Sequence, residues 1–186
     1  MIEFIKGKGK NLDIKQNGEI IKFKIEKSNI PRGVVVQEYS EYKSKNFIID
    51  LSDKNNFDQL RNLEREIIKE LSNKSMEIFK KPMNEDDIID IYNSNLSPDG
   101  MLRLKYTPDT VLYNENGNPL AEKVIYDGIF TNWDIVCNYI VSGVYFMDRK
   151  IGLVLKANHV KLFKSDPKNQ CLINTDSDSD SDSDSD

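Results

Sequence analysis

The hydrophobic period changes twice along the chain, and this pattern limits the folds that are available to it. Residues 21–26 alternate between apolar and charged side chains, which is typical of a strand with one buried face. Over residues 57–71 the apolar side chains recur every three or four positions, which predicts an amphipathic helix that ends before Pro82. Strict alternation returns in MLRLKY, residues 101–106. The pattern predicts two groups of strands with a helical insertion at about residues 56–95.

Turn signals divide the second group of strands. The sequence NENGNP, residues 114–119, contains an Asn-Gly step that favours a tight turn, and DRK, residues 148–150, predicts a second one. The segments rich in Ile, Val, Tyr and Phe are predicted strands: 123–130, 134–147 and 151–163. The alternation slips near His159, which predicts a bulge. Six to nine short strands with one helical insertion predict a mainly β (α+β) fold, and the short connections favour a small antiparallel barrel.

The last eleven residues, 176–186, alternate strictly between Asp and Ser. They hold six of the 31 acidic residues, so the rest of the chain has 25 acids against 26 bases and a formal charge of +1 instead of −5. A segment without apolar residues cannot bury surface, so we expect a disordered, solvated tail that follows a linker from residue 166. It is interpreted as a solubilising tail or as a phosphate mimic that competes for a basic groove; its acids are Asp176, Asp178, Asp180, Asp182, Asp184 and Asp186.

The composition disfavours several classes of protein. No window approaches the ~18 consecutive apolar residues of a membrane-spanning helix, and the N-terminal residues have no apolar segment typical of a secretory signal. Cys137 and Cys171 match no disulfide or metal spacing, and Cys137 fits a buried core thiol on an apolar strand. A single histidine excludes most zinc sites. We therefore expect neither a cofactor nor a bound metal ion.

Cations interleaved with aromatic rings on strands suggest a nucleic-acid partner. A single strand requires positive charges along its phosphates and flat rings against its unstacked bases. Tyr106 shares the apolar face of its strand, so it is assigned to the core. The candidate nucleic-acid-binding residues are Lys22, Lys24, Arg103, Lys105, Trp133, Tyr139, Tyr145, Arg149, Lys150, Lys156, Lys161 and Lys164.

Other interpretations of the polar residues are kept open. Asp109 and Asp148 would be the metal ligands of a magnesium-dependent nuclease, with Lys150 beside the scissile phosphate, although both aspartates also suit ordinary turns. His159 has no evident nucleophilic partner, so a structural role is favoured. The acidic run at residues 85–90 is interpreted as the first turn of a short helix capped by Asn84. A further alternative is a non-enzymatic scaffold whose acidic tail binds a basic partner.

The segment from Met101 to Phe163 resembles the single-stranded DNA-binding proteins of large nucleocytoplasmic DNA viruses, which are related to the replicative single-strand binders of phages. The resemblance is carried by the MLRLKYT strand, the NENGNP turn, the YDGIF segment and the final VSGVYFMDRKIGLVLKANHVKLF, followed by an acidic tail. It covers about a third of the chain and the tail. The phage tails end in an aromatic residue, whereas this sequence ends at Asp186.

The resemblance implies an OB-fold barrel over residues 1–165 that binds single-stranded DNA without sequence preference and catalyses no reaction. Lys105 and Lys156 are the matching residues. The tail would screen the groove and recruit replication proteins in viral DNA replication, recombination or repair. The expected location is the host cell cytoplasm or nucleus, without secretion or a membrane partner. The helical insertion is expected either to pack on the barrel or to make a homodimer contact. RNA as the ligand remains an alternative.

Overall fold

The computed structural model describes residues 1–7, 11–38, 43–51, 54–120 and 125–164 of the chain. Nine strands and three helices form these parts. In chain order they are β1 (Ile2–Lys6), β2 (Leu12–Gln16), β3 (Ile21–Ile30), β4 (Val34–Glu38), β5 (Lys43–Asp50), α1 (Lys54–Asn73), α2 (Ser75–Phe79), α3 (Glu85–Ile89), β6 (Met101–Tyr106), β7 (Val111–Tyr113), β8 (Trp133–Met147) and β9 (Lys150–Phe163). The structure confirms the predicted mainly β class with a helical insertion.

Five strand positions form an OB-like barrel. Hydrogen bonds join the strands in the order β8-β9-β6-β5-β4, and β3 pairs with β8 at the other end of this path. Because only the turn at residues 31–33 separates β3 from β4, the two act as one bent strand that returns the path to its start. Counting this bent strand as the first, the spatial order is 1-2-3-5-4, with β5 and β6 as the second and third strands.

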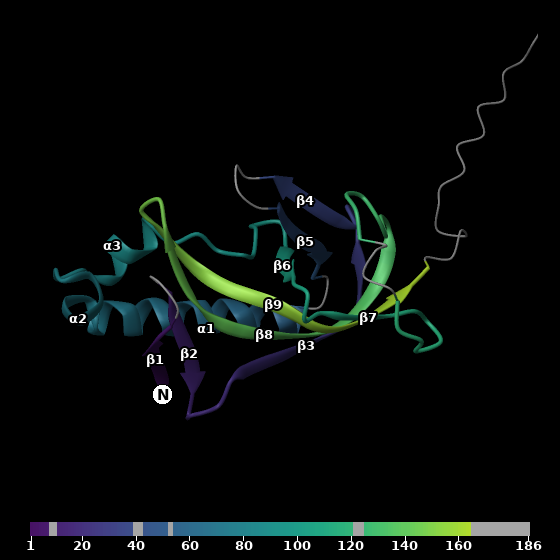
Figure 1. Ribbon diagram of the computed structural model, residues 1–186. Helices are drawn as coiled ribbons and strands as arrows, with labels where there is room; N and C mark the ends of the chain where they lie inside the picture. The colour runs from purple at the N-terminus through teal and green to yellow at the C-terminus, as the bar shows by residue number, and fades with distance from the viewer. Residues whose placement is uncertain (8–10, 39–42, 52–53, 121–124, 165–186) are drawn as a thin grey trace, which may run out of the picture.

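Most strand pairs are antiparallel, as the sequence predicts, but β6 and β7 pair with β9 in parallel. The parallel direction follows from the connection, because the chain passes through β8 on the other side of β9 before it returns as β9. The long β8–β9 pair curves across the molecule, with α3 near its hairpin and β7 near its opposite end (Figure 1). The hairpin β1–β2 extends the sheet by pairing β2 with β8 at Leu12 and Val144.

The inward side chains of the strands and one face of α1 form a single core. Leu102, Leu104 and Tyr106 are buried on one face of β6, in agreement with the sequence pattern. The apolar side chains of α1 join the same core: Leu60, Leu63, Ile67, Ile68 and Leu71. None of the helices in the described part of the chain is long and apolar enough to cross a membrane.

The short helix α3 follows from its capping residues. The Asn84 side chain accepts a hydrogen bond from the Asp87 amide at 2.8 Å, and the Asp87 carboxylate accepts one from the Asn84 amide at 2.9 Å. This capping box satisfies amides that a helix leaves unpaired at its start. The interpretation of the acidic run as a helix N-terminus is therefore confirmed.

The described part of the predicted strand at residues 123–130 is not a strand. Residues 125 and 126 have no regular structure, residues 127–130 form turns, and Gly128 and Phe130 have positive φ angles of 75° and 65°. The apolar pattern that predicted a strand reflects burial instead. Ile125, Ile129 and Phe130 are buried, but their backbone is irregular. The loop is held by β4, whose Val34 amide donates to the Ile129 carbonyl oxygen at 2.9 Å.

The bend between β3 and β4 gives a prediction about stability. Gly33 has a φ of 60°, and a Cβ atom there would lie 2.1 Å from the Ile129 carbonyl oxygen. Gly117 also has a positive φ, of 82°, but a Cβ atom there has open space around it. We expect Gly117→Ala to cost roughly 1–2 kcal/mol, the backbone penalty alone, and Gly33→Ala to cost clearly more. Urea unfolding of both variants measures the difference, and equal losses would contradict the proposed contact.

Candidate functional site

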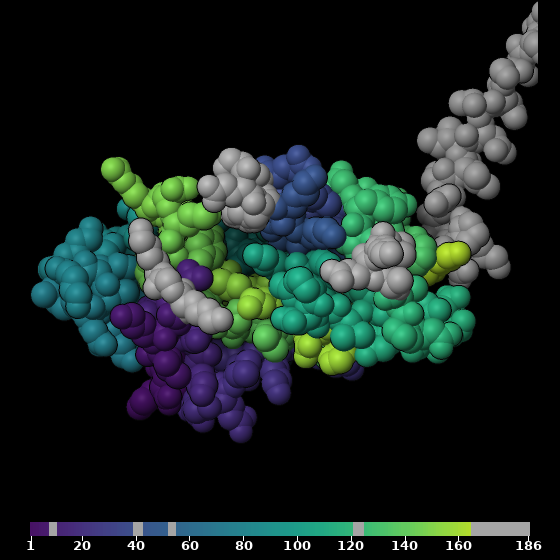
Figure 2. All heavy atoms as spheres, viewed as in Figure 1, coloured from purple at the N-terminus to yellow at the C-terminus, as the bar shows by residue number. Residues whose placement is uncertain are grey.

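A groove of about 800 Å³ crosses the outer side of the barrel. It runs over β5, β6 and β9 to the hairpin end of β8, and its walls include residues of β2 and of the segment 93–95. Figure 2, viewed as in Figure 1, shows atoms of β9 in yellow-green near the centre of this side of the molecule. Four candidate nucleic-acid-binding residues line the groove: Arg103, Lys105, Tyr145 and Lys156.

The register of three adjacent strands brings the two groove lysines together. Asn46 of β5 lies opposite Lys105 of β6, and Lys105 lies opposite Lys156 of β9. Paired residues of neighbouring strands point to the same side of a sheet, so the two ammonium-bearing side chains emerge next to each other. Arg103 is two residues before Lys105 and therefore shares its face. The result is a row of three cations beside an amide.

Few acidic side chains neutralise the positive charge of this row. Among the residues that the structure describes, no salt bridge involves Arg103, Lys105 or Lys156. One exposed carboxylate, that of Asp13, also lines the groove. Like charges placed opposite each other on a sheet are destabilising. An anionic ligand in the groove would relieve this repulsion.

Tyr145 provides an aromatic ring at the hairpin end of the groove. It lies opposite Gly152 in the β8–β9 register, and a Cβ atom at Gly152 would lie 2.6 Å from the tyrosine hydroxyl oxygen. Glycine therefore lets the ring lie against β9. The Asn93 amide group donates a hydrogen bond to the Tyr145 hydroxyl at 2.9 Å, which fixes the outer end of the ring. The half-buried ring has the properties of a platform for a flat ligand.

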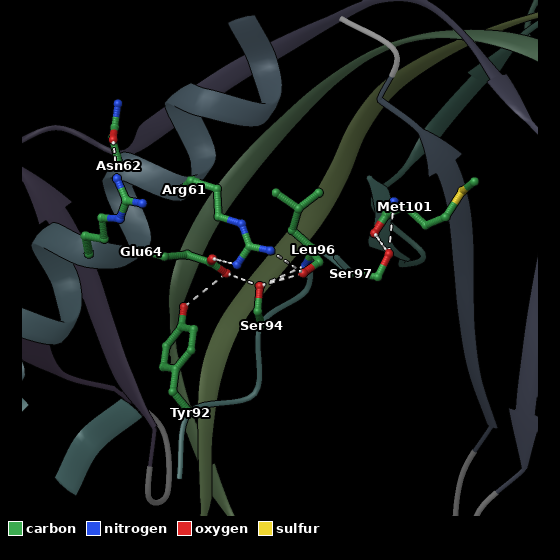
Figure 3. A network of polar contacts seen from close by, with 9 residues as sticks. Arg61, Asn62, Glu64, Tyr92, Ser94, Leu96, Ser97 and Met101 are labelled. Atoms are coloured by element: carbon green, nitrogen blue, oxygen red, sulfur yellow. Dashed lines mark hydrogen bonds and ion pairs between the residues drawn. The ribbon is translucent and has the colours of Figure 1, made fainter. Parts of the chain in front are cut away.

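Hydrogen bonds of the segment 93–97 connect the groove strands to helix α1. The Asn95 side chain donates to the Leu153 carbonyl oxygen at 2.8 Å, and the Asn95 carbonyl oxygen accepts from the Arg103 amide at 2.8 Å. One residue earlier, the Ser94 hydroxyl donates to the Glu64 carboxylate at 2.7 Å. Figure 3 shows the contacts around Glu64, which Ser94 and Tyr92 approach through their hydroxyl groups and Arg61 approaches to 3.5 Å.

Glu64 is a buried carboxylate that supports the groove from beneath. Its residue is only 3% exposed, and the Tyr92 hydroxyl donates to it at 3.4 Å. Burial raises the pKa of Glu64 because the charged form loses its hydration, while Ser94, Arg61 and Tyr92 oppose this by stabilising the carboxylate. These hydrogen bonds orient the segment 93–97, because Ser94 is bonded to Glu64 of α1 and Asn95 is bonded to Leu153 of β9.

The other candidate residues lie outside the groove. Lys22 and Lys24 are exposed on β3, and Lys24 forms a salt bridge of 2.7 Å with Glu26. Arg149 and Lys150 are exposed at the β8–β9 hairpin.

The remaining lysine and tryptophan candidates lie at the opposite end of the β8–β9 pair. There Trp133 is half-buried against Phe130, at 5.1 Å between ring centroids, and the Lys164 ammonium lies 5.8 Å from the Trp133 ring. Lys161, on β9, lies on the other side of the sheet from Leu162 and Lys164.

The prediction that Tyr139 stacks on a base is wrong. Its side chain is 1% exposed and packs against Phe23 at a centroid distance of 5.3 Å. The alternation along β8 places it with Cys137 on the core side, where burial also raises the pKa of both groups. The sequence misled because this strand has apolar residues on both faces. Cys137 is buried, as predicted.

The proposed nuclease site is not assembled. Asp109 precedes Thr110, whose hydroxyl donates to the Ala157 carbonyl oxygen at 2.8 Å. Asp148 lies in the hairpin before Lys150, seven residues along β9 from Ala157, which corresponds to about 23 Å of strand. In the described part of the chain, no group of three or more His, Cys, Asp and Glu residues is arranged to hold a metal ion.

Sequence analysis missed the amide and hydroxyl residues of the groove. They are Asn11, Gln37, Ser44, Asn46, Asn93, Ser94, Asn95 and Ser142. Asn46 directly precedes the mainly apolar run at residues 47–51, and nothing in the sequence distinguishes it from other polar residues at the start of a strand. The acids of the tail, from Asp176 to Asp186, and Cys171 lie outside the described residues.

One comparison with solved structures supports the type of fold. No protein-family model and no curated protein matches the sequence. Among solved structures, gp2.5, a single-stranded DNA-binding protein encoded by bacteriophage T7, has a TM-score of 0.50 and 13% identity over 79% of this chain and 88% of that chain. The single-stranded DNA-binding protein of bacteriophage Enc34 has a TM-score of 0.48 and 11% identity over 89% of this chain and 91% of that chain.

A structure of the Enc34 protein in complex with single-stranded DNA has a TM-score of 0.45 and 10% identity, over 89% of this chain and 96% of that chain. The likeness to the T7 protein shows a shared fold. At these identities, the function of this chain has to be argued from its own residues.

The Glu64 network predicts a pH dependence of stability. Because the pKa of Glu64 is raised in the folded state, the unfolded chain ionises this group first as the pH rises above its ordinary value of 4.5. The free energy of unfolding contributed by Glu64 therefore falls with rising pH until the raised pKa is passed. We expect Glu64→Gln to gain stability relative to the wild type as the pH rises from 4.5 towards 7.

Glu66→Gln is the matched control, because Glu66 is exposed on the same helix. Thermal unfolding at a series of pH values measures all three proteins. Parallel curves for the wild type and Glu64→Gln would contradict the assigned direction of the shift.

Proposed function

We propose that this protein binds single-stranded DNA without sequence preference through the groove on β5, β6, β8 and β9. The observation that carries the proposal is the placement of Lys105 directly opposite Lys156 on adjacent strands, beside Arg103 and without a salt bridge to any described residue. Three cations along one face neutralise successive phosphates, and Tyr145 supplies a ring on which a base stacks. Contacts of this kind do not read base edges, so they give no sequence preference.

The position of the groove in the fold supports the same ligand. In OB-folds the second and third strands form the face that binds oligonucleotides, and here these strands are β5 and β6. The T7 protein that shares this fold is a single-stranded DNA-binding protein. Phosphate neutralisation and base stacking neither make nor break covalent bonds, so we propose a binding protein without enzymatic activity.

The wider role is part of the proposal. Binding without sequence preference suits viral DNA replication, recombination or repair, in the host cell cytoplasm or nucleus. The acidic residues from Asp176 to Asp186 would compete with DNA for the groove and recruit replication proteins with basic surfaces. A homodimer formed through the helical insertion remains compatible with this role.

Removal of the groove charges tests the proposal. We expect Lys105→Ala and Lys156→Ala each to weaken binding of labelled oligo-dT and to reduce the slope of log affinity against log salt by about 0.7, because each lysine neutralises one phosphate. Fluorescence anisotropy at several salt concentrations measures both effects. The matched control is Lys69→Ala, which removes an exposed lysine from α1. An unchanged slope in the groove variants would reject this site.

Removal of the tail tests the competition. We expect residues 1–175 to bind oligo-dT more tightly than the full chain at low salt, with the difference shrinking at high salt because ions screen the tail. Replacement of the six tail aspartates by Asn keeps the length and should reproduce the effect of the deletion. Equal affinities at low salt would contradict the competition.

A further inference from the structure

We propose that the binding path for single-stranded DNA continues beyond the groove, along the outer face of β9, to a second set of rings and cations around His159, Lys161 and Phe163. This inference rests on the proposed function, because it extends the path of the same ligand. It starts from the strand pattern. After the bulge at Asn158, the outward side chains of β9 are those of His159, Lys161 and Phe163, while Val160 and Leu162 are buried.

The outer face of β9 is continuous between the two places. The groove includes Val154 and Lys156, and the outward side chains next along the strand belong to His159, Lys161 and Phe163. Lys156 and Phe163 are seven residues apart, which corresponds to about 23 Å of strand. The neighbouring strand changes from β6 at Lys156 to β7 at Lys161, and both run parallel to β9. In Figure 1 this part of β9 extends towards β7, away from the hairpin.

The first pair of rings on this path is Tyr113 and His159. Tyr113 of β7 stacks on His159 with a centroid distance of 6.0 Å and an interplanar angle of 24°. The Tyr113 hydroxyl lies 3.3 Å from His159 Nδ1, which holds the two rings together. His159 is exposed, so the pair offers a flat surface to solvent next to Lys161, which lies opposite Tyr113 in the register. A base can stack on such a surface whatever its identity.

The next ring on this path is that of Phe163, and two lysine ammonium groups lie close to it. The ammonium groups of Lys27 and Lys161 both lie 5.3 Å from the centroid of the Phe163 ring. Lys27 also lies 3.2 Å from the Asp134 carboxylate, and its side chain is 60% exposed. Two ammonium groups at one ring with one carboxylate nearby leave an excess of positive charge. A phosphate beside the ring would accept from both lysines, because their long stems allow the ammonium groups to move.

The combination matches the requirements for a single strand better than those for a protein partner. Rings and cations alternate along β9 at the spacing of two residues, and a polymer with alternating bases and phosphates contacts both kinds of group. The surface has no exposed aliphatic anchor among His159, Lys161 and Phe163. The acidic tail would satisfy the cations but would leave the rings without a partner, because Asp and Ser carry no ring.

The single histidine of the chain gives a direct probe. The imidazole proton resonances of His159 in the full chain are followed by NMR while dT30 is added. We expect them to shift upon binding. In anisotropy titrations with dT30, Phe163→Ala should weaken binding about fivefold or more through lost stacking, and Lys161→Ala should reduce the salt slope by about 0.7.

The controls separate this inference from the proposed function. Lys69→Ala should leave the dT30 affinity and the His159 response unchanged, and Lys105→Ala should weaken binding but keep the His159 shift at saturating DNA. If dT30 binds the wild type but the His159 resonances do not move and neither Phe163→Ala nor Lys161→Ala changes binding, the path ends at the groove and this inference is wrong. If dT30 does not bind at all, the proposed function fails as well.

The tail as the occupant of this surface has its own signature. Removal of residues 176–186 would then shift the His159 resonances in the absence of DNA, and DNA would not shift them in the shortened chain. That result would overturn the inference in favour of a docked tail. A shift on adding DNA to residues 1–175 supports the path along β9.

Discussion

The first barrel strand bends at Gly33, where a backbone with a φ of 60° lies against the Ile129 carbonyl oxygen. This close contact lets β3 pair with β8 while β4 pairs with β5, so that one strand serves both edges of the barrel. The connection through β8 makes β9 run parallel to β6, and the register of this pair places Lys105 opposite Lys156. The charged row of the groove therefore lies in the middle of a strand path whose two ends are joined by this bent strand.

The elements of the fold were predictable where one physical signal dominated. The period of α1, the cap at Asn84 and the inward face of β6 all follow from local patterns that the structure confirms. The loop at residues 125–130 was mistaken for a strand because buried apolar side chains look alike in a strand and in an irregular loop. Periodicity reports burial, and backbone conformation follows from it only when the element is regular.

The candidate site was harder to predict because register decides it. Lys105 and Lys156 were named from the sequence, but 50 positions separate them, and only the pairing of β6 with β9 shows that they are neighbours. Tyr139 and Tyr145 lie on one strand and both were selected, yet a bulge in β8 and the core separate their environments: one is buried against Phe23 and the other lines the groove. A one-residue change of phase reverses such an assignment.

The groove holds a row of three cations on a nearly neutral barrel, whereas residues 176–186 hold six acids and no base. The eleven residues 165–175 tether the acids of residues 176–186 to the end of β9. A tether of eleven residues places the groups at its two ends at an effective concentration of about millimolar, which does not depend on the amount of protein present. Under the proposed competition, the acids of residues 176–186 compete with DNA at this constant local concentration. A short oligonucleotide contacts only the groove cations, so it has few contacts with which to displace them. Under the proposed path, a long strand would also follow β9 and gain stacking contacts that the acids cannot make. The proposed tail would then discriminate by length as well as by charge.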